Sequence, residues 1–150
     1  MMRIMQDTRL EEFKRVEHLL YGINYAVWFN LYGPADPDLG LNDALKILIS
    51  MDCDISGVVP STADEAVSEI MDKVLYAGDT GSGPLDIESK KAEISELMGK
   101  VFSIVGIEDA ELVIEFGFKS GHPGYPVFWD FAYDIHSKGH RWIFVGSSSD

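Results

Sequence analysis

Apolar residues recur at helical spacing in four stretches of the chain. In the first stretch they follow one face from Leu10 to Leu20, and Thr8 with Glu11 fits a capping box at its start. In the third stretch, Ser61 or Thr62 is the expected N-cap. The pattern therefore predicts three further helices over residues 42–51, 62–76 and 86–105.

The final third of the chain changes to strand periodicity. Apolar and polar positions alternate over 112–118, 127–137 and 140–147. Lys138-Gly139 suits a two-residue hairpin turn, which would place Ser137 opposite His140. One face of this hairpin then carries large apolar side chains that must be buried: Trp129, Phe131, Tyr133, Ile135, Trp142 and Phe144.

Residues 23–32 fit both periods. Their aromatic and β-branched side chains alternate as in a strand, whereas Leu20, Ile23 and Val27 continue the stripe of the first helix. We favour a helix here because of that continuity. The stretches 33–40 and 52–60 are predicted to be loops.

The order of these elements predicts an α+β fold. We expect a mostly helical N-terminal two thirds packed on a C-terminal three-stranded antiparallel sheet. At 150 residues, the chain (1–150) is expected to form a single domain that buries about 70% of its unfolded surface. It lacks the ~18 consecutive apolar residues of a membrane helix, and its single cysteine, Cys53, cannot form an internal disulfide. We therefore expect a cytoplasmic protein with no membrane contact.

The net excess of negative charge lies in the middle of the chain. The net charge is −13, and residues 36–115 hold 18 acidic residues against five lysines, while the segments on either side are neutral. Such a concentration of charge repels itself and attracts cations or basic partners. It argues against direct nucleic-acid binding, because phosphate contacts need clustered Lys and Arg.

Three of these carboxylates fall on one face of the helix predicted over 62–76: Glu65, Glu69 and Asp72. Carboxylates on a rigid helix can steer a basic protein into fast association, so these are candidate partner-binding residues; an ordinary solvated helix face is the alternative. We favour a non-enzymatic acidic protein that binds a basic protein partner and uses no cofactor. In size, acidity and α+β content the chain resembles small acidic bacterial immunity and inhibitor proteins, which block basic toxins such as nucleases. That resemblance identifies no particular residue.

The alternative function is a small enzyme or a metal-binding domain. Residues 52–57 resemble the first half of an EF-hand calcium loop, D-x-D-x-S-G, which makes Asp52, Asp54 and Ser56 candidate metal ligands. The twelfth position of that loop is Ala63 rather than the bidentate Glu, so two oxygen ligands are missing. An Asx-rich turn between helices is the competing interpretation.

A second place for the alternative function is the outer face of the predicted hairpin. Asp130, Asp134 and His136 share this face with Arg141, so an acid–base site is conceivable there. The competing interpretation is a solvated sheet face on which Asp134 and Arg141 form a surface ion pair.

Overall fold

Helices and strands alternate along the chain. The computed structural model describes residues 9–150. The helices in this part of the chain are α1 (Glu11–Leu20), α2 (Leu41–Leu48), α3 (Ala63–Val74) and α4 (Lys91–Val105), with two 3-10 turns, η1 (Ile87–Ser89) and η2 (Ile107–Asp109). The strands are β1 (Gly22–Ile23), β2 (Ala26–Ala35), β3 (Asp54–Pro60), β4 (Gly83–Pro84), β5 (Ala110–Ser120), β6 (Trp129–Ser137) and β7 (His140–Ser149).

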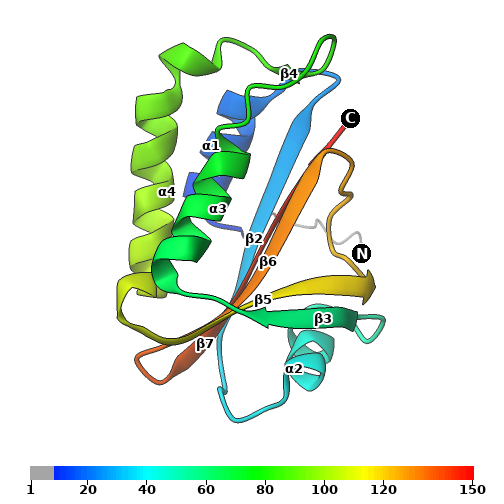
Figure 1. Ribbon diagram of the computed structural model, residues 1–150, viewed down its shortest axis with the longest axis vertical. Helices are drawn as coiled ribbons and strands as arrows, with labels where there is room; N and C mark the ends of the chain where they lie inside the picture. The colour runs from blue at the N-terminus through cyan, green and yellow to red at the C-terminus, as the bar shows by residue number, and fades with distance from the viewer. Residues whose placement is uncertain (1–8) are drawn as a thin grey trace, which may run out of the picture.

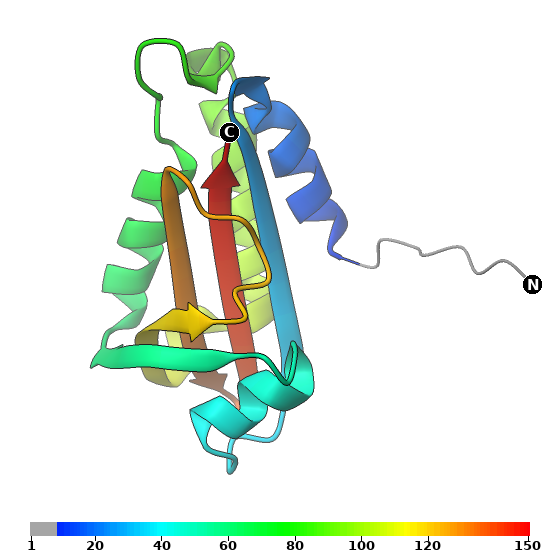
Figure 2. The same cartoon turned by 90° about the vertical axis from the view of Figure 1, so that its right-hand side faces the viewer.

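The main sheet has five strands in the order β2-β7-β6-β5-β3, and every neighbouring pair is antiparallel. Helices α1, α3 and α4 lie on one face of this sheet, and α2 lies near its lower end (Figure 1). After a quarter turn, α2 is seen in front of the sheet and α4 behind it (Figure 2). The short strands β1 and β4 form a separate pair.

The predicted α+β class is confirmed, but the predicted arrangement is wrong. The helices do not precede the sheet, and the sheet has five strands rather than three. The two additional strands, β2 and β3, come from the first half of the chain and form the two edges of the sheet. Both lie in segments whose local sequence favoured another structure.

The predicted helix over 23–32 is wrong, because most of this segment belongs to β2. Strand β2 pairs with β7, with Phe29 opposite Gly146, and Val27 and Phe29 are buried on the side covered by α1. The same apolar positions could have continued a helix, so local spacing did not decide between the two structures. Pairing with β7 decided it, and β2 also takes in 33–35 of the predicted loop.

The predicted loop over 52–60 is also wrong from Asp54 onward. These residues form β3, which pairs with β5 along its length, with Val58 opposite Phe116. Aspartate, glycine and proline give this segment the composition of a loop. The unpaired side of β5 nevertheless supplies main-chain hydrogen-bond partners, which local composition cannot reveal.

The other four predicted helices are present with adjusted ends. Thr62 is the N-cap of α3, and its side chain accepts a hydrogen bond from the main-chain N–H of Glu65 at 3.2 Å. Gly106 ends α4 in the left-handed conformation, with φ of 70°. The predicted cap Thr8 lies outside the described residues, and the N-cap of α1 is Leu10. No helix in the described part of the chain is long and apolar enough to cross a membrane.

The predicted hairpin register is confirmed from Ser137 opposite His140 to Phe131 opposite Gly146. On the side facing α1, α3 and α4, Phe131, Tyr133, Ile135 and Phe144 are buried, while the two tryptophans are half-buried. The indole N–H of Trp129 donates to the hydroxyl of Tyr25 at 2.8 Å.

The prediction of a solvated outer hairpin face is wrong. Ala132, Ile143 and Val145 are buried there in a second apolar cluster with Leu45 of α2. Asp134 and Arg141 are buried as well, and Arg141 Nε lies 3.0 Å from Asp134 Oδ1. Arg141 also donates to the main-chain oxygen of Leu39 at 2.8 Å, which ties the segment before α2 to the sheet. The pair is therefore part of the packing between α2 and the sheet.

Candidate functional site

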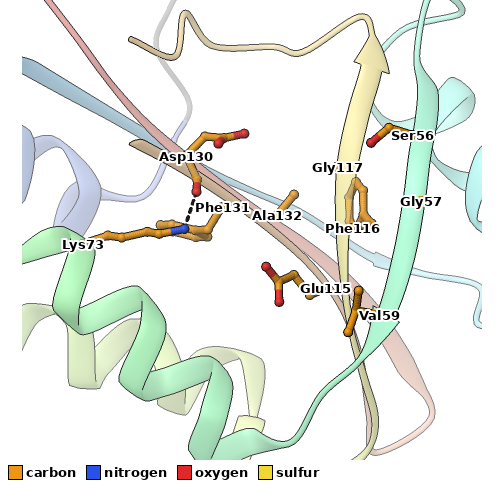
Figure 3. A pocket seen from close by; sticks show the side chains of 10 residues that line it. All are labelled: Ser56, Gly57, Val59, Lys73, Glu115, Phe116, Gly117, Asp130, Phe131 and Ala132. Carbon is orange, nitrogen blue, oxygen red and sulfur yellow. Dashed lines mark hydrogen bonds between the residues drawn. The ribbon is translucent and has the colours of Figure 1, made fainter. Parts of the chain in front are cut away.

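The sheet opens between β5 and β6. These strands pair from Ala110 opposite Ser137 to Glu115 opposite Tyr133; beyond that point β5 pairs only with β3, and β6 only with β7. Figure 1 shows β3 and β5 crossing the direction of β6. The opening holds a cleft of about 390 Å³ (Figure 3). Its lining comes from three strands and α3: Ser56, Gly57, Val59, Lys73, Glu115, Phe116, Gly117, Asp130, Phe131 and Ala132.

Close contact between β3 and β5 accompanies this opening. The β3–β5 register shifts between Ile55 and Gly57, so Ser56 is an extra residue on β3. A Cβ at Gly117 would lie 2.6 Å from Ser56 Oγ, too close for any other residue without a shift. A larger residue at this position would therefore displace the hydroxyl of Ser56 at the edge of the cleft.

One wall of the cleft is tied to α3 by hydrogen bonds. Lys73 Nζ donates to Glu69 Oε1 at 2.8 Å and to the main-chain oxygen of Asp130 at 2.6 Å. Figure 3 shows Lys73 reaching from α3 to Asp130, with Glu115 extending into the same space. The hydroxyl of buried Tyr133 donates to Glu69 Oε2 at 2.6 Å. Glu69 is therefore a half-buried group that attaches α3 to the sheet.

The carboxyl groups of Glu69 and Glu115 are shifted in opposite directions. Burial alone would raise the pKa of Glu69, but hydrogen bonds from Lys73 and Tyr133 and the lysine charge lower it below its usual value. Burial and the negative charge of Glu69 raise the pKa of Glu115, and Lys73 offsets this only in part. Glu115 in the cleft and Glu69 in the adjoining groove are thus both influenced by a single ammonium group, that of Lys73.

Asp130 has a different partner from the other carboxyl groups. Its Oδ2 lies 3.6 Å from Nε2 of His122, in the connection between β5 and β6. The interaction with His122 lowers the pKa of Asp130, against an opposing effect of burial. Asp130 therefore lines the cleft with a carboxylate that interacts with His122.

The three residues predicted to bind a partner are divided between two environments. Glu65 and Asp72 are exposed on α3, whereas Glu69 is held by Lys73 and Tyr133. The outer side of α3 forms a shallow groove of about 570 Å³ that shares Lys73 with the cleft. Its lining is Asp64, Glu65, Ser68, Glu69, Asp72 and Lys73. We call this groove and the adjoining cleft the acidic surface.

The remaining acidic residues are spread over the molecule. Asp36 and Asp38 lie in the connection to α2, and Asp52 lies between α2 and β3. Because α2 packs on the opposite face of the sheet from α3, these carboxylates do not join the acidic surface. The charge that is concentrated in sequence is thus divided between the two faces.

The candidate metal ligands Asp52, Asp54 and Ser56 do not enclose a common centre. Asp54 and Ser56 belong to β3, whose main chain is extended, whereas a calcium loop must curl around its ion. Asp52 is exposed in the turn before β3, and its main-chain oxygen accepts a hydrogen bond from Ser120 Oγ at 2.9 Å. Within residues 9–150, no group of three or more His, Cys, Asp or Glu side chains is placed to hold a metal ion.

Two of the three candidate hairpin residues are brought together, because Nε2 of His136 lies 3.1 Å from Asp134 Oδ1. Asp134 is buried against Arg141, and Nε2 of His136 accepts a hydrogen bond from Arg141 Nε at 3.1 Å. Asp130 belongs to the cleft, at the other end of β6. Two of the three therefore take part in structural contacts beneath α2.

Sequence reasoning missed Lys73, Glu115 and Tyr133 as members of the site. Tyr133 was recognised as a core residue, and its hydroxyl was not considered. Glu115 lies beside Tyr133 only because of the β5–β6 register. A carboxylate within an otherwise apolar strand was the one available signal.

No known protein family matches the chain, and neither does any curated protein sequence. Among the solved structures that share its fold are two crystal structures of citrus MAF1. They superimpose with TM-scores of 0.55 and 0.52, covering 92% of this chain and 98% of theirs. Sequence identity is 11% and 10%, so the similarity shows the fold alone.

Proposed function

We propose that this chain is a non-enzymatic binding protein that docks a basic protein partner on the acidic surface. The observation that carries the proposal is the charge imbalance between the cleft and the groove on α3, where Lys73 is bonded to Glu69 and only partly offsets the effect of Glu69 on Glu115. A cationic side chain from a partner would relieve the repulsion between these carboxyl groups. The fold places this imbalance beside the exposed carboxylates of α3.

The exposed carboxylates have a separate role in this proposal. Asp64, Glu65 and Asp72 project from a rigid helix into solvent, where their field acts on an approaching partner before contact. Such charges mainly increase the association rate, whereas a partly desolvated group such as Glu115 affects dissociation. The proposal therefore assigns steering to α3 and retention to the cleft.

An immunity or inhibitor role is the specific form of this proposal, and it rests on size, acidity and α+β content. We propose the cytoplasm as its location, because the single cysteine, Cys53, is buried as a free thiol.

The test is a capture experiment with charge variants. Immobilised protein would be exposed to a lysate of the native host at low and high salt, beside Glu65→Lys/Asp72→Lys. The matched control, Glu88→Lys/Glu96→Lys, changes the net charge equally at exposed positions away from α3. We expect a basic protein to be retained by the wild type and the control, and lost with the α3 variant or at high salt, where the screening length falls below ~8 Å. Equal retention by both variants would contradict the proposal.

A further inference from the structure

Strand β3 forms an edge of the sheet that is covered only at its start, where the N–H of Ile55 donates to Asn42 Oδ1 at 3.2 Å. It is the last strand in the order β2-β7-β6-β5-β3, and no other described strand pairs with its outer side. Val58 and Val59 are 51% and 58% exposed. Such an edge presents main-chain groups that can pair with another chain.

The register shows which main-chain groups face outward. The N–H of Ser61 donates to the main-chain oxygen of Val113 at 2.9 Å, so Ser61 is directed toward β5. Main-chain groups alternate in direction along an antiparallel strand, and the register is regular from Gly57 to Pro60. Gly57 and Val59 therefore also face β5. Val58 directs both its N–H and its C=O away from the sheet.

A bulge and a proline, which both oppose strand pairing, flank Val58 on this edge without including it. The bulge lies at Ser56, before the regular segment, and β3 carries no lysine. The main-chain groups of Pro60, like those of Val58, face away from β5, so the missing N–H of the proline costs no hydrogen bond to β5. An added strand could thus pair with the main chain of Val58, next to the exposed side chains of Val58 and Val59.

The surroundings of this edge select a positively charged strand. Asp54 begins β3, Asp64 and Glu65 follow it at the start of α3, and Glu115 lies opposite Val59 on β5. A second copy of this chain would bring two acidic surfaces together, which a net charge of −13 opposes. Charge complementarity therefore favours a basic occupant.

We propose that an extended segment of a basic protein adds to β3 as a sixth strand of the sheet. Val58 exchanges main-chain hydrogen bonds with this segment, and its Lys or Arg side chains contact Asp64, Glu65 and Glu115. The inference rests on the proposed function and specifies how the partner would bind. Main-chain pairing supplies affinity, and the flanking carboxylates select for charge.

The test uses a synthetic peptide of alternating lysine and valine, with a glutamate–valine peptide as the charge control. Val58→Pro removes the outward N–H while leaving the bonds to β5 in place, and Val58→Ala keeps the N–H. We expect the lysine peptide alone to bind, and its binding to slow hydrogen exchange of the Val58 amide. Its affinity should fall about tenfold in Val58→Pro and remain near wild type in Val58→Ala. Circular dichroism and thermal melting would verify that both variants are folded.

Two results separate this inference from the proposed function. If Glu65→Lys/Asp72→Lys weakens peptide binding but Val58→Pro does not, strand addition is overturned and the acidic docking surface stands. If Val58→Pro weakens binding but charge reversal does not, strand addition stands and the electrostatic function fails. A wild-type dimer that Val58→Pro dissociates in sedimentation would overturn the inference, because the occupant would then be a second copy.

Discussion

The carboxylate of Glu69 accepts a hydrogen bond from the hydroxyl of Tyr133 at 2.6 Å, across 64 residues of sequence. Glu69 belongs to the polar stripe of α3, and Tyr133 belongs to the buried face of the hairpin. Their contact joins α3 to strand β6 of the sheet. It also explains why a glutamate that looks like a surface residue in the sequence is half-buried in the structure.

Removing the hydroxyl in Tyr133→Phe should destabilise the protein. The substitution takes one donor from the half-buried carboxylate of Glu69, and hydrogen bonds to charged groups contribute about 1.5–3 kcal/mol. Urea denaturation should show a loss in that range, and the pKa of Glu69 should rise in an NMR titration. Tyr125→Phe is the control, since Tyr125 is 73% exposed. An unchanged unfolding midpoint in Tyr133→Phe would show that the contact contributes little.

Glu115→Gln should raise the melting temperature at neutral pH. The pKa of Glu115 is raised in the folded state, so folding favours its protonated form. The contribution of Glu115 to the free energy of unfolding is full below its pKa in the unfolded chain, about 4.3. This contribution is lost as the pH rises through its pKa in the folded protein. Glutamine remains neutral and avoids this loss, so the gain should shrink as the pH falls toward 4.

The opposite sign is expected for Glu69→Gln. Hydrogen bonds lower the pKa of Glu69 in the folded protein. Its contribution to the free energy of unfolding is therefore present above its pKa in the unfolded chain, and is lost as the pH falls through its pKa in the folded protein. Glu69→Gln should therefore lower the melting temperature at pH 7, with a smaller effect in acid. Glu111→Gln, at an exposed position of β5, is the control. Shifts of the same sign in Glu69→Gln and Glu115→Gln would contradict the charge assignment of the cleft.

Asp134→Ala should be among the most destabilising single substitutions. It leaves the buried guanidinium of Arg141 without its carboxylate, and breaking a buried pair in this way costs about 3–5 kcal/mol. The exposed pair of Glu96 and Lys100 is the comparison, and Glu96→Ala should cost less than about 1 kcal/mol. Both free energies would come from urea unfolding. Similar values for the two variants would show that solvent reaches Arg141.

Cys53 should be unreactive in the folded protein. Its side chain is buried, Sγ lies 3.3 Å from the main-chain oxygen of Gly121, and burial raises the pKa of the thiol. The thiolate is the reactive form, so modification by a thiol reagent such as dithiobisnitrobenzoate should be slow until denaturant is added. Rapid modification of the native protein would indicate that the segment between α2 and β3 opens readily.

Elements whose signals are local could be predicted from the order of the amino acids alone. The hairpin register follows from the Lys138-Gly139 turn and the alternation on either side, and both are confirmed. The start of α3 follows from Thr62, whose side chain caps the helix within its first turn. In each case the interacting groups lie within a few residues of one another, so the pattern contains the whole interaction.

Only the tertiary structure decided the sheet edges, the buried outer hairpin face and the cleft. Val27 and Phe29 suit a helix or a strand equally, and β2 forms because the free side of β7 satisfies its main-chain groups. The burial of Asp134 depends on α2 covering the sheet, and the pKa of Glu115 depends on Glu69 of α3. Hydrogen bonding, desolvation and Coulomb interaction all act through distance in space, and a linear pattern records distance only along the chain.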